Sequence, residues 1–136
     1  MGQQQLLLII LGVIVVGIAV AVGITMFTEN AVSANRDAVT NDLVNLAARA
    51  QQFFRRPTTL GGGGNSFVGL TADAAGLRKL SRDATNPNGT YSITSAGTAT
   101  TVVIQGVGKE LVDGTNPVTM EIHIFRNQTD SVVAIH

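Results

Sequence analysis

The chain has 136 residues, nine Lys and Arg against nine Asp and Glu, and no cysteine. The lack of cysteine excludes a disulfide framework and a thiolate metal site. A formal net charge of zero and no visible basic run argue against nucleic-acid binding, for which a basic patch is expected. The positive mean hydropathy of +0.29 comes largely from one N-terminal run.

That run extends from Leu6 to Phe27, and Thr25 is its only clearly polar side chain. As an α-helix it would be roughly 33 Å long, which is enough to cross the hydrocarbon core of a bilayer. A cleavable signal peptide is disfavoured, because no Lys or Arg precedes the run and it is too long for a signal core. On this segment alone, a simple membrane anchor is an equally good interpretation.

The helical pattern continues beyond the apolar run as far as Phe54. Apolar residues recur there at steps of three, four and seven, which is the spacing of one helix face. The first proline of the chain is Pro57, and it ends the pattern because the residue before a proline disfavours helical conformation. We expect the second half of this helix to pack on a folded domain through Val39, Leu43, Leu46, Ala50 and Phe53.

Residues 57–89 are interpreted as the segment that connects the helix to the strands. The run Gly61–Gly64 lacks the Lys and Ser/Thr that follow a phosphate-binding loop, so a flexible surface loop is expected. Ala72–Arg82 predicts a short helix. Three apolar residues are expected to pack the connection against the domain: Phe67, Val68 and Leu70.

The last third of the chain predicts four strands separated by turn-forming residues. In Val118–Phe125, Val, Met and Ile alternate with Thr119, Glu121 and His123, so one face is expected to be buried and the other polar. Short turns predict an antiparallel meander covered on one face by the helix. The expected strands are Thr90–Ser95, Thr100–Gly106 continuing over Val107–Val112 past a glycine-marked bulge, Val118–Phe125 and Ser131–Ile135.

These elements predict an α+β fold in which a long N-terminal helix packs on a small antiparallel sheet. We expect residues 1–56 to form the helix, with an apolar part over 1–28 and a part over 29–56 that packs on a globular head. The β-rich head is expected over 57–136 and includes this connecting segment.

A long helix, apolar over Leu6–Phe27 and amphipathic to Phe54, followed by a β-rich head, resembles the type IV pilin superfamily. The resemblance covers the architecture of the whole chain, and its sequence-specific part is the helix. It implies that residues 57–89 correspond to the variable loop between the long helix and the sheet. It implies a structural major subunit of an extracellular, pilus-like helical filament, without enzymatic activity or cofactor. Implied partners are further copies of the chain and an assembly machinery in the inner membrane, where the subunit would reside before assembly.

In such a filament the apolar part of the helix would be buried among copies of itself. Because lipid and protein cores are both apolar, packing quality would have to stabilise the assembly, and small residues allow helices to approach closely. Glycine is also common in ordinary transmembrane helices. The glycines of this segment are therefore compatible both with close packing between copies and with a simple membrane span. The expected core-packing residues are Leu6, Leu7, Ile10, Gly12, Val13, Gly17, Ala21 and Gly23.

The N-terminus departs from many bacterial members of the family, which have glutamate as the fifth mature residue. Counting from Met1, that position is Gln5. We expect Met1, Gln3, Gln4 and Gln5 to form a polar ring of amide hydrogen bonds, since an unpaired charge in an apolar core is costly. Either a leader upstream of Met1 is removed, or the subunit is made without one; cleavage after Gly2 is a third possibility.

No pattern indicates a catalytic, cofactor-binding or metal site. His123 and His136 are interpreted as solvated surface residues, with a two-histidine metal site as the alternative. Asn88 and Asn127 begin matches to the N-glycosylation pattern and are possible acceptors.

Two further functions stay open. The chain could be a pseudopilin or minor pilin of a secretion or DNA-uptake system, which would be scarce in sheared surface material. It could also be a monomeric membrane-anchored binding domain, which would not form higher cross-linked species.

Overall fold

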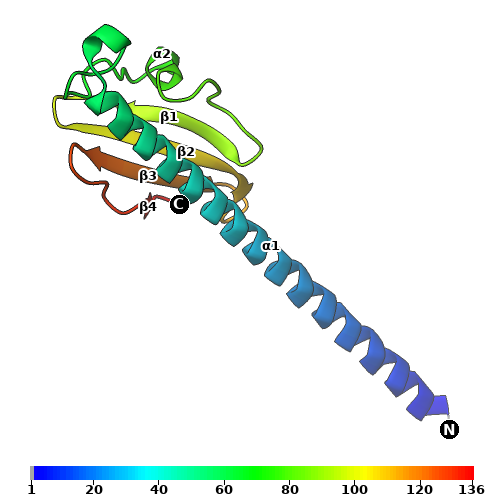
Figure 1. The fold of residues 1–136 in the computed structure, drawn as a ribbon. Coiled ribbons are helices and arrows are strands. Elements are labelled where there is room, and N and C mark those ends of the chain that lie inside the picture. The colour runs from blue at the N-terminus through cyan, green and yellow to red at the C-terminus, as the bar shows by residue number, and fades with distance from the viewer. Residues whose placement is uncertain (1) are drawn as a thin grey trace. The chain divides into compact units, whose positions relative to one another are not determined.

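The computed structural model describes residues 2–136 and contains a long helix, two short helical segments and a four-stranded antiparallel sheet (Figure 1). The expected fold class is confirmed, because the long N-terminal helix packs on this small sheet. In chain order the elements are α1 (Gly2–Arg55), η1 (Thr58–Leu60), α2 (Ala74–Arg78), β1 (Gly89–Ser95), β2 (Thr101–Leu111), β3 (Pro117–Phe125) and β4 (Val133–Ala134).

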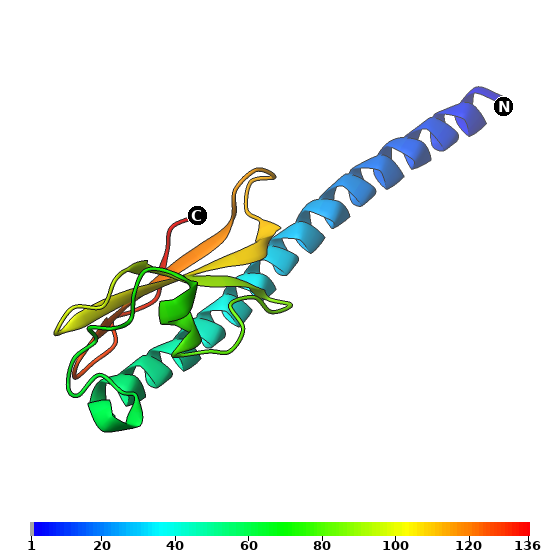
Figure 2. The same cartoon turned by 90° about the horizontal axis from the view of Figure 1, so that it is seen from above.

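Two compact units divide the chain within α1. The first ends at Ala31, and the second, here called the C-terminal unit, comprises Val32–His136. The part of α1 that follows Ala31 therefore shares one core with the sheet. Figure 2 shows this part of α1 lying on one side of the sheet.

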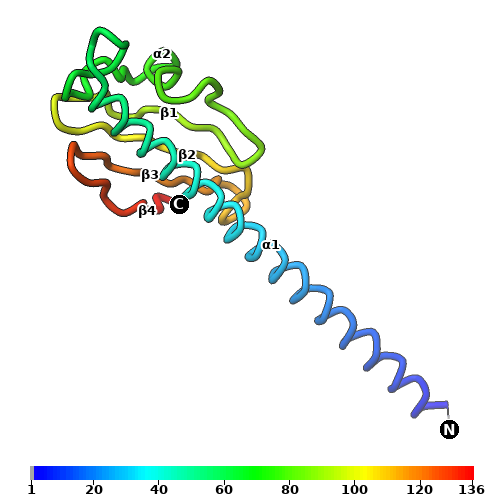
Figure 3. Tube along the Cα trace, in the orientation of Figure 1, coloured from blue at the N-terminus to red at the C-terminus, as the bar shows by residue number. Residues whose placement is uncertain are grey.

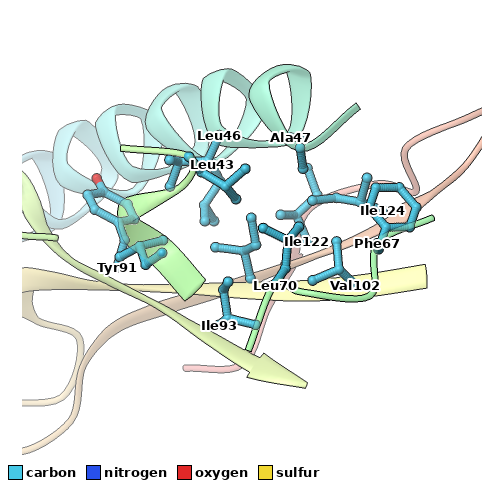
Figure 4. Close-up of a cluster of buried hydrophobic side chains, with 14 of the residues drawn as sticks. Leu43, Leu46, Ala47, Phe67, Leu70, Tyr91, Ile93, Val102, Ile122 and Ile124 are labelled. Carbon is cyan, nitrogen blue, oxygen red and sulfur yellow. The ribbon is translucent and has the colours of Figure 1, made fainter. Parts of the chain in front are cut away.

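The core of the C-terminal unit lies between α1 and the inner face of the sheet (Figure 4). Val39, Leu43 and Ala50 are completely buried, as the helix spacing predicts for a packed face. The connection adds Phe67 and Leu70, which are also completely buried. The other buried core residues of α1 are Leu46, Ala47, Phe53 and Phe54. Val68 does not belong to this core: it is 61% exposed, contrary to the expectation from sequence.

The glycine run forms a hydrogen-bonded cap on α1, which corrects the expectation of a flexible loop. The last carbonyl groups of a helix have no partner within the helix. Here the backbone N–H groups of Gly63 and Asn65 donate to the carbonyl oxygens of Phe53 and Phe54, at 2.8 and 2.7 Å. A Cβ on Gly63 would lie 1.8 Å from the Ser66 carbonyl oxygen, so only glycine fits this fold of the chain.

The sheet is a simple meander with strand order β1-β2-β3-β4, and all pairs are antiparallel (Figure 3). β2 is one continuous strand whose pairing with β3 shifts register between Val107 and Leu111. β4 is shorter than expected and consists of Val133–Ala134, which pair with Glu121 and Met120 of β3. The helix α2 is likewise shorter than the expected Ala72–Arg82.

Thr119 corrects the predicted alternation of β3. It was expected on the polar face, but only 8% of it is exposed. Its carbonyl oxygen accepts a hydrogen bond from the backbone N–H of Ile135 at 2.8 Å, and its hydroxyl donates to the Pro117 carbonyl oxygen. The C-terminal segment therefore lies along β3 at this point.

Two glycines of β2 allow α1 to approach the sheet closely. A Cβ on Gly106 would lie 2.8 Å from Val39 Cγ1 and 2.9 Å from the Tyr91 ring, and a Cβ on Gly108 would lie 2.1 Å from Asn35 Oδ1. Glycine inside a strand commonly marks such an approach of another segment. Gly106 and Gly108 are thus packing positions within a strand.

Replacing Leu43 by Ala is expected to destabilise the C-terminal unit by about 2–5 kcal/mol, because the side chain is completely buried and its removal leaves a cavity. Urea unfolding of the full chain in detergent, followed by the fluorescence of Tyr91, the one tyrosine, measures this loss. Val44→Ala is the matched control: Val44 is 50% exposed, so a change within about 0.5 kcal/mol is expected. Equal losses for both variants would contradict the described helix face.

Candidate functional site

The apolar segment, Leu6–Phe27 of α1, exposes every one of its side chains in the structure. Its large apolar side chains are between 52% and 77% exposed, the extremes being Val22 and Phe27. The helix is long and apolar enough to cross a membrane, and its most apolar 18-residue window has a mean hydropathy of 3.2.

An exposed apolar surface of this size has to be buried away from water. Sixteen large apolar residues are exposed along this segment, and burying each one fully gains about 1.5–3 kcal/mol. Leaving them in water therefore forgoes a free energy on the order of tens of kcal/mol. Soluble monomers rarely expose a contiguous apolar surface beyond a few hundred Å². The segment must be covered by lipid or by protein.

The few polar side chains near this surface are satisfied by the helix itself. The Thr25 hydroxyl donates to the Ala21 carbonyl oxygen at 3.1 Å, and the Thr28 hydroxyl donates to the Ile24 carbonyl oxygen at 3.0 Å. Because an unpaired hydroxyl is costly in an apolar medium, these bonds allow the segment to enter lipid or a protein core intact.

The glycines of the apolar segment have no packing role within the chain. Within residues 2–136, a Cβ added to Gly12, Gly17 or Gly23 would meet no atom beyond the neighbouring helix backbone within 4 Å. Each glycine nevertheless weakens helix formation in water by about 1 kcal/mol relative to alanine. Gly106 and Gly108, in contrast, are each required by a neighbouring segment. The open helix glycines therefore suit close contact with another molecule, for which small residues are the usual means in membranes.

The residues expected in an N-terminal polar ring are placed only in part. Gln3, Gln4 and Gln5 are exposed helical residues, and Met1 lies outside the described residues. The amide ring itself requires contacts between copies and stays a prediction.

Sequence reasoning did not identify a group of polar side chains of α1 that attach the helix to the rest of the C-terminal unit. Asp42 is the centre of this group. Its Oδ2 accepts hydrogen bonds from Asn86 Nδ2 at 2.8 Å, from Asn88 Nδ2 at 3.0 Å and from the Tyr91 hydroxyl. One carboxylate thus joins the helix to β1 and to the turn before it.

Asn35 and Arg49 extend this group along the same side of the helix, each seven residues from Asp42. Asn35 Nδ2 donates to the Asn88 carbonyl oxygen at 2.8 Å, and Asn35 Oδ1 accepts from the backbone N–H of Lys109 at 3.0 Å. Arg49 Nη1 donates to the Leu80 carbonyl oxygen at 3.1 Å. Two helical turns separate successive members, so this row is a regular polar border of the apolar face. We call Asn35, Asp42 and Arg49 the polar row.

The ionisation of the Asp42–Tyr91 pair follows from these contacts. Partial burial opposes the charge on Asp42, but hydrogen bonds from Tyr91, Asn88 and Asn86 outweigh this effect and lower the pKa of Asp42 below its ordinary 3.8. Burial, together with the bond to the Asp42 carboxylate, raises the pKa of Tyr91 above its ordinary 10.0. The pair is held as carboxylate and neutral phenol across the whole physiological range.

Replacing Asp42 by Asn is expected to destabilise the C-terminal unit by about 1–3 kcal/mol at pH 7, because a charged acceptor of three bonds is lost. The lowered pKa stabilises the fold above pH 3.8, and this contribution disappears as the pH falls through the folded-state pKa. The difference in free energy of unfolding between wild type and variant should therefore shrink below pH 3.8. Urea unfolding at pH 7 and at pH 3 measures both values.

Asp37→Asn is the matched control, since it removes an exposed carboxylate from the same helix. We expect it to change the unfolding free energy by less than about 0.5 kcal/mol. A difference for Asp42→Asn that persists unchanged at pH 3 would refute the role given to its charge.

The other candidate residues are spread over the surface of the C-terminal unit. Nε2 of His123 lies 3.0 Å from Glu121 Oε1, while His136 is an exposed terminal residue. Within residues 2–136, no three His, Asp or Glu side chains are grouped as metal ligands. The two possible glycosylation positions differ: the Asn88 amide is bonded to Asp42, whereas Asn127 is exposed.

Comparisons of the chain with protein-family models, with curated proteins and with solved structures found no match.

Proposed function

We propose that this chain is the structural major subunit of an extracellular, type IV pilus-like helical filament. The observation that carries the proposal is the apolar segment, whose exposed surface requires a cover and whose three glycines have no packing role within the chain. The architecture adds support, since a long N-terminal helix packed on a small antiparallel sheet is the arrangement expected of such a subunit.

The mechanism follows from the two apolar surroundings in which this segment can be buried, the bilayer and the filament core. In a bilayer, the helix satisfies its own backbone groups, and Thr25 and Thr28 are bonded to the helix backbone. In a filament, the same residues pack against other copies, with Gly12, Gly17 and Gly23 at the closest approaches. Transfer between these surroundings exchanges one apolar medium for another, so the change in hydrophobic free energy is small.

Assembly also requires a repeated, non-closing contact. A heterologous contact between identical subunits generates an open helical polymer when its rotation does not close a ring. A helix with an apolar surface on all sides suits this requirement, because each copy offers contacts to several neighbours at once. Extraction from the membrane would be performed by an assembly machinery in the inner membrane, which is the proposed partner before export.

A monomeric membrane anchor is the competing function, because the helix is long and apolar enough to span a bilayer. The two differ in what they require of the helix glycines. An anchor tolerates a large apolar residue at Gly17, where nothing in the chain lies within 4 Å of an added Cβ, whereas close packing between copies does not.

Replacing Gly17 by Leu is therefore expected to abolish filaments, or to reduce them at least about tenfold, while the chain still partitions with the membrane. Leucine keeps the segment apolar and favours the helix, so insertion should be unchanged. Negative-stain microscopy of material sheared from cells measures filaments, and membrane fractionation measures insertion.

Ile18→Leu is the matched control, because it adds no volume at the neighbouring position and should leave filaments at wild-type yield. Filaments of normal abundance from Gly17→Leu would remove the role given to the glycines. Wild-type cells without filaments in which the chain is abundant in the membrane would favour the anchor.

A further inference from the structure

The zero net charge of the chain conceals a strong local excess of positive charge. Six of the nine Lys and Arg residues belong to two segments, the end of α1 and the region of α2. No basic run is visible in the sequence because these segments are more than twenty residues apart. They are Arg49, Arg55 and Arg56 in the first segment, and Arg78, Lys79 and Arg82 in the second.

Three of these cations line one pocket of the C-terminal unit. Arg49 belongs to the last turns of α1, Arg56 follows α1 directly, and Lys79 follows α2 directly. The pocket has a volume of about 190 Å³, well above the ~15 Å³ that one water requires. Its remaining walls are Gln52, Phe53 and Leu80, so no carboxylate lines it.

Within the described residues, the cations of this pocket form no ion pair with a carboxylate. Within residues 2–136, no carboxylate oxygen lies within 4.0 Å of Arg49, Arg56 or Lys79. Arg49 donates to the Leu80 carbonyl oxygen and Lys79 donates to the Gly69 carbonyl oxygen, which fixes both side chains in place. These bonds use one donor of each group and leave the others for a ligand.

Acidic residues lie near the pocket, but none of them lines it. Asp73 attracts Lys79 electrostatically, and its Oδ1 is used as the N-cap of α2, accepting from the Gly76 backbone N–H at 2.8 Å and from the Thr71 hydroxyl. Asp83 lines two adjoining depressions, one that includes Lys79 and one that includes Arg49. Like charges held together repel one another, so an anion in the pocket would relieve this repulsion.

We propose that the pocket of Arg49, Arg56 and Lys79 binds a phosphate group, either as the free ion or as the terminal phosphate of a small ester. Two guanidinium groups supply paired N–H donors that match phosphate oxygens, and the ammonium adds a further charged donor. The Gln52 amide at the wall supplies a neutral donor. The site belongs to the C-terminal unit alone and does not depend on polymerisation.

The test is a titration of the full chain in a non-ionic detergent with inorganic phosphate, followed by isothermal calorimetry at constant ionic strength. A second titration with glycerol 3-phosphate distinguishes the free ion from an ester. We expect saturable binding with one site per chain. Arg56→Gln should weaken it at least about tenfold, because hydrogen bonds between charged groups are the strong ones.

Arg56 is the residue of choice for this test because it is exposed and its side chain makes no hydrogen bond within the described residues, so the fold should be retained. Arg55→Gln and Arg126→Gln are the matched controls. Both remove an exposed arginine, but neither residue lines the pocket. Each should bind phosphate within about twofold of wild type, since screened surface charges contribute little.

Three results would overturn the proposal. Wild-type chain that shows no saturable binding up to tens of millimolar phosphate would exclude the site. Equal weakening by Arg55→Gln and Arg56→Gln would indicate diffuse attraction to the positive surface. Tight binding of an oligonucleotide that phosphate does not displace would assign the cations to a polyanion instead.

Discussion

The apolar segment imposes the constraint on which the rest of the structure depends. Sixteen large apolar side chains on one helix are exposed, and water is a poor solvent for such a surface. Only lipid or other apolar protein can cover it. The helix meets this requirement by satisfying its own backbone and hydroxyl groups, so that no polar group opposes the transfer from one cover to the other.

Beyond Ala31 the same helix packs on the small sheet and contributes to its core. Apolar residues such as Leu43 supply the core, and Gly106 and Gly108 allow the backbone of β2 to lie close to the helix. The polar row borders this apolar face and joins the helix to β1, to β2 and to the segment that follows α2. Hydrogen bonds to the Asp42 carboxylate are directional, so they fix the position of the helix more closely than apolar contact alone.

The glycine run completes this attachment at the far end of the helix. Its backbone N–H groups bind the last carbonyl oxygens of α1, and the chain then returns toward the sheet through the buried Phe67 and Leu70. The same end of the helix brings Arg49 and Arg56 beside Lys79. A cap and a positive pocket therefore share one corner of the C-terminal unit.

The features that repeat along the sequence were predictable, and those that depend on distant contacts were not. The spacing of Val39, Leu43 and Ala50 predicts a buried helix face, and the turns of the last third predict a meander, because both follow from local periodicity. The role of Asp42 could not be predicted, since its hydrogen-bond partners lie more than forty residues away in the sequence. The gathering of Arg56 and Lys79 depends on the same long-range folding.

The remaining errors have similar causes. Glycine repeats are compatible with both a flexible loop and a tight cap, and only the nearby end of α1 decides between them at Gly63. Thr119 is buried because the C-terminal segment lies against it, which strand alternation does not reveal. The open glycines of the apolar segment are informative only when the structure shows that nothing in the chain approaches them.

The most direct measurement is a cryo-electron microscopy reconstruction of fibres sheared from cells that produce the chain. If copies of the apolar segment cover one another, the map will show many Leu6–Phe27 helices in contact along the axis, with Gly12, Gly17 and Gly23 where neighbouring helices approach most closely. Fibres built without this segment at their centre, or shed material that contains the chain only as separate single copies, would contradict that claim.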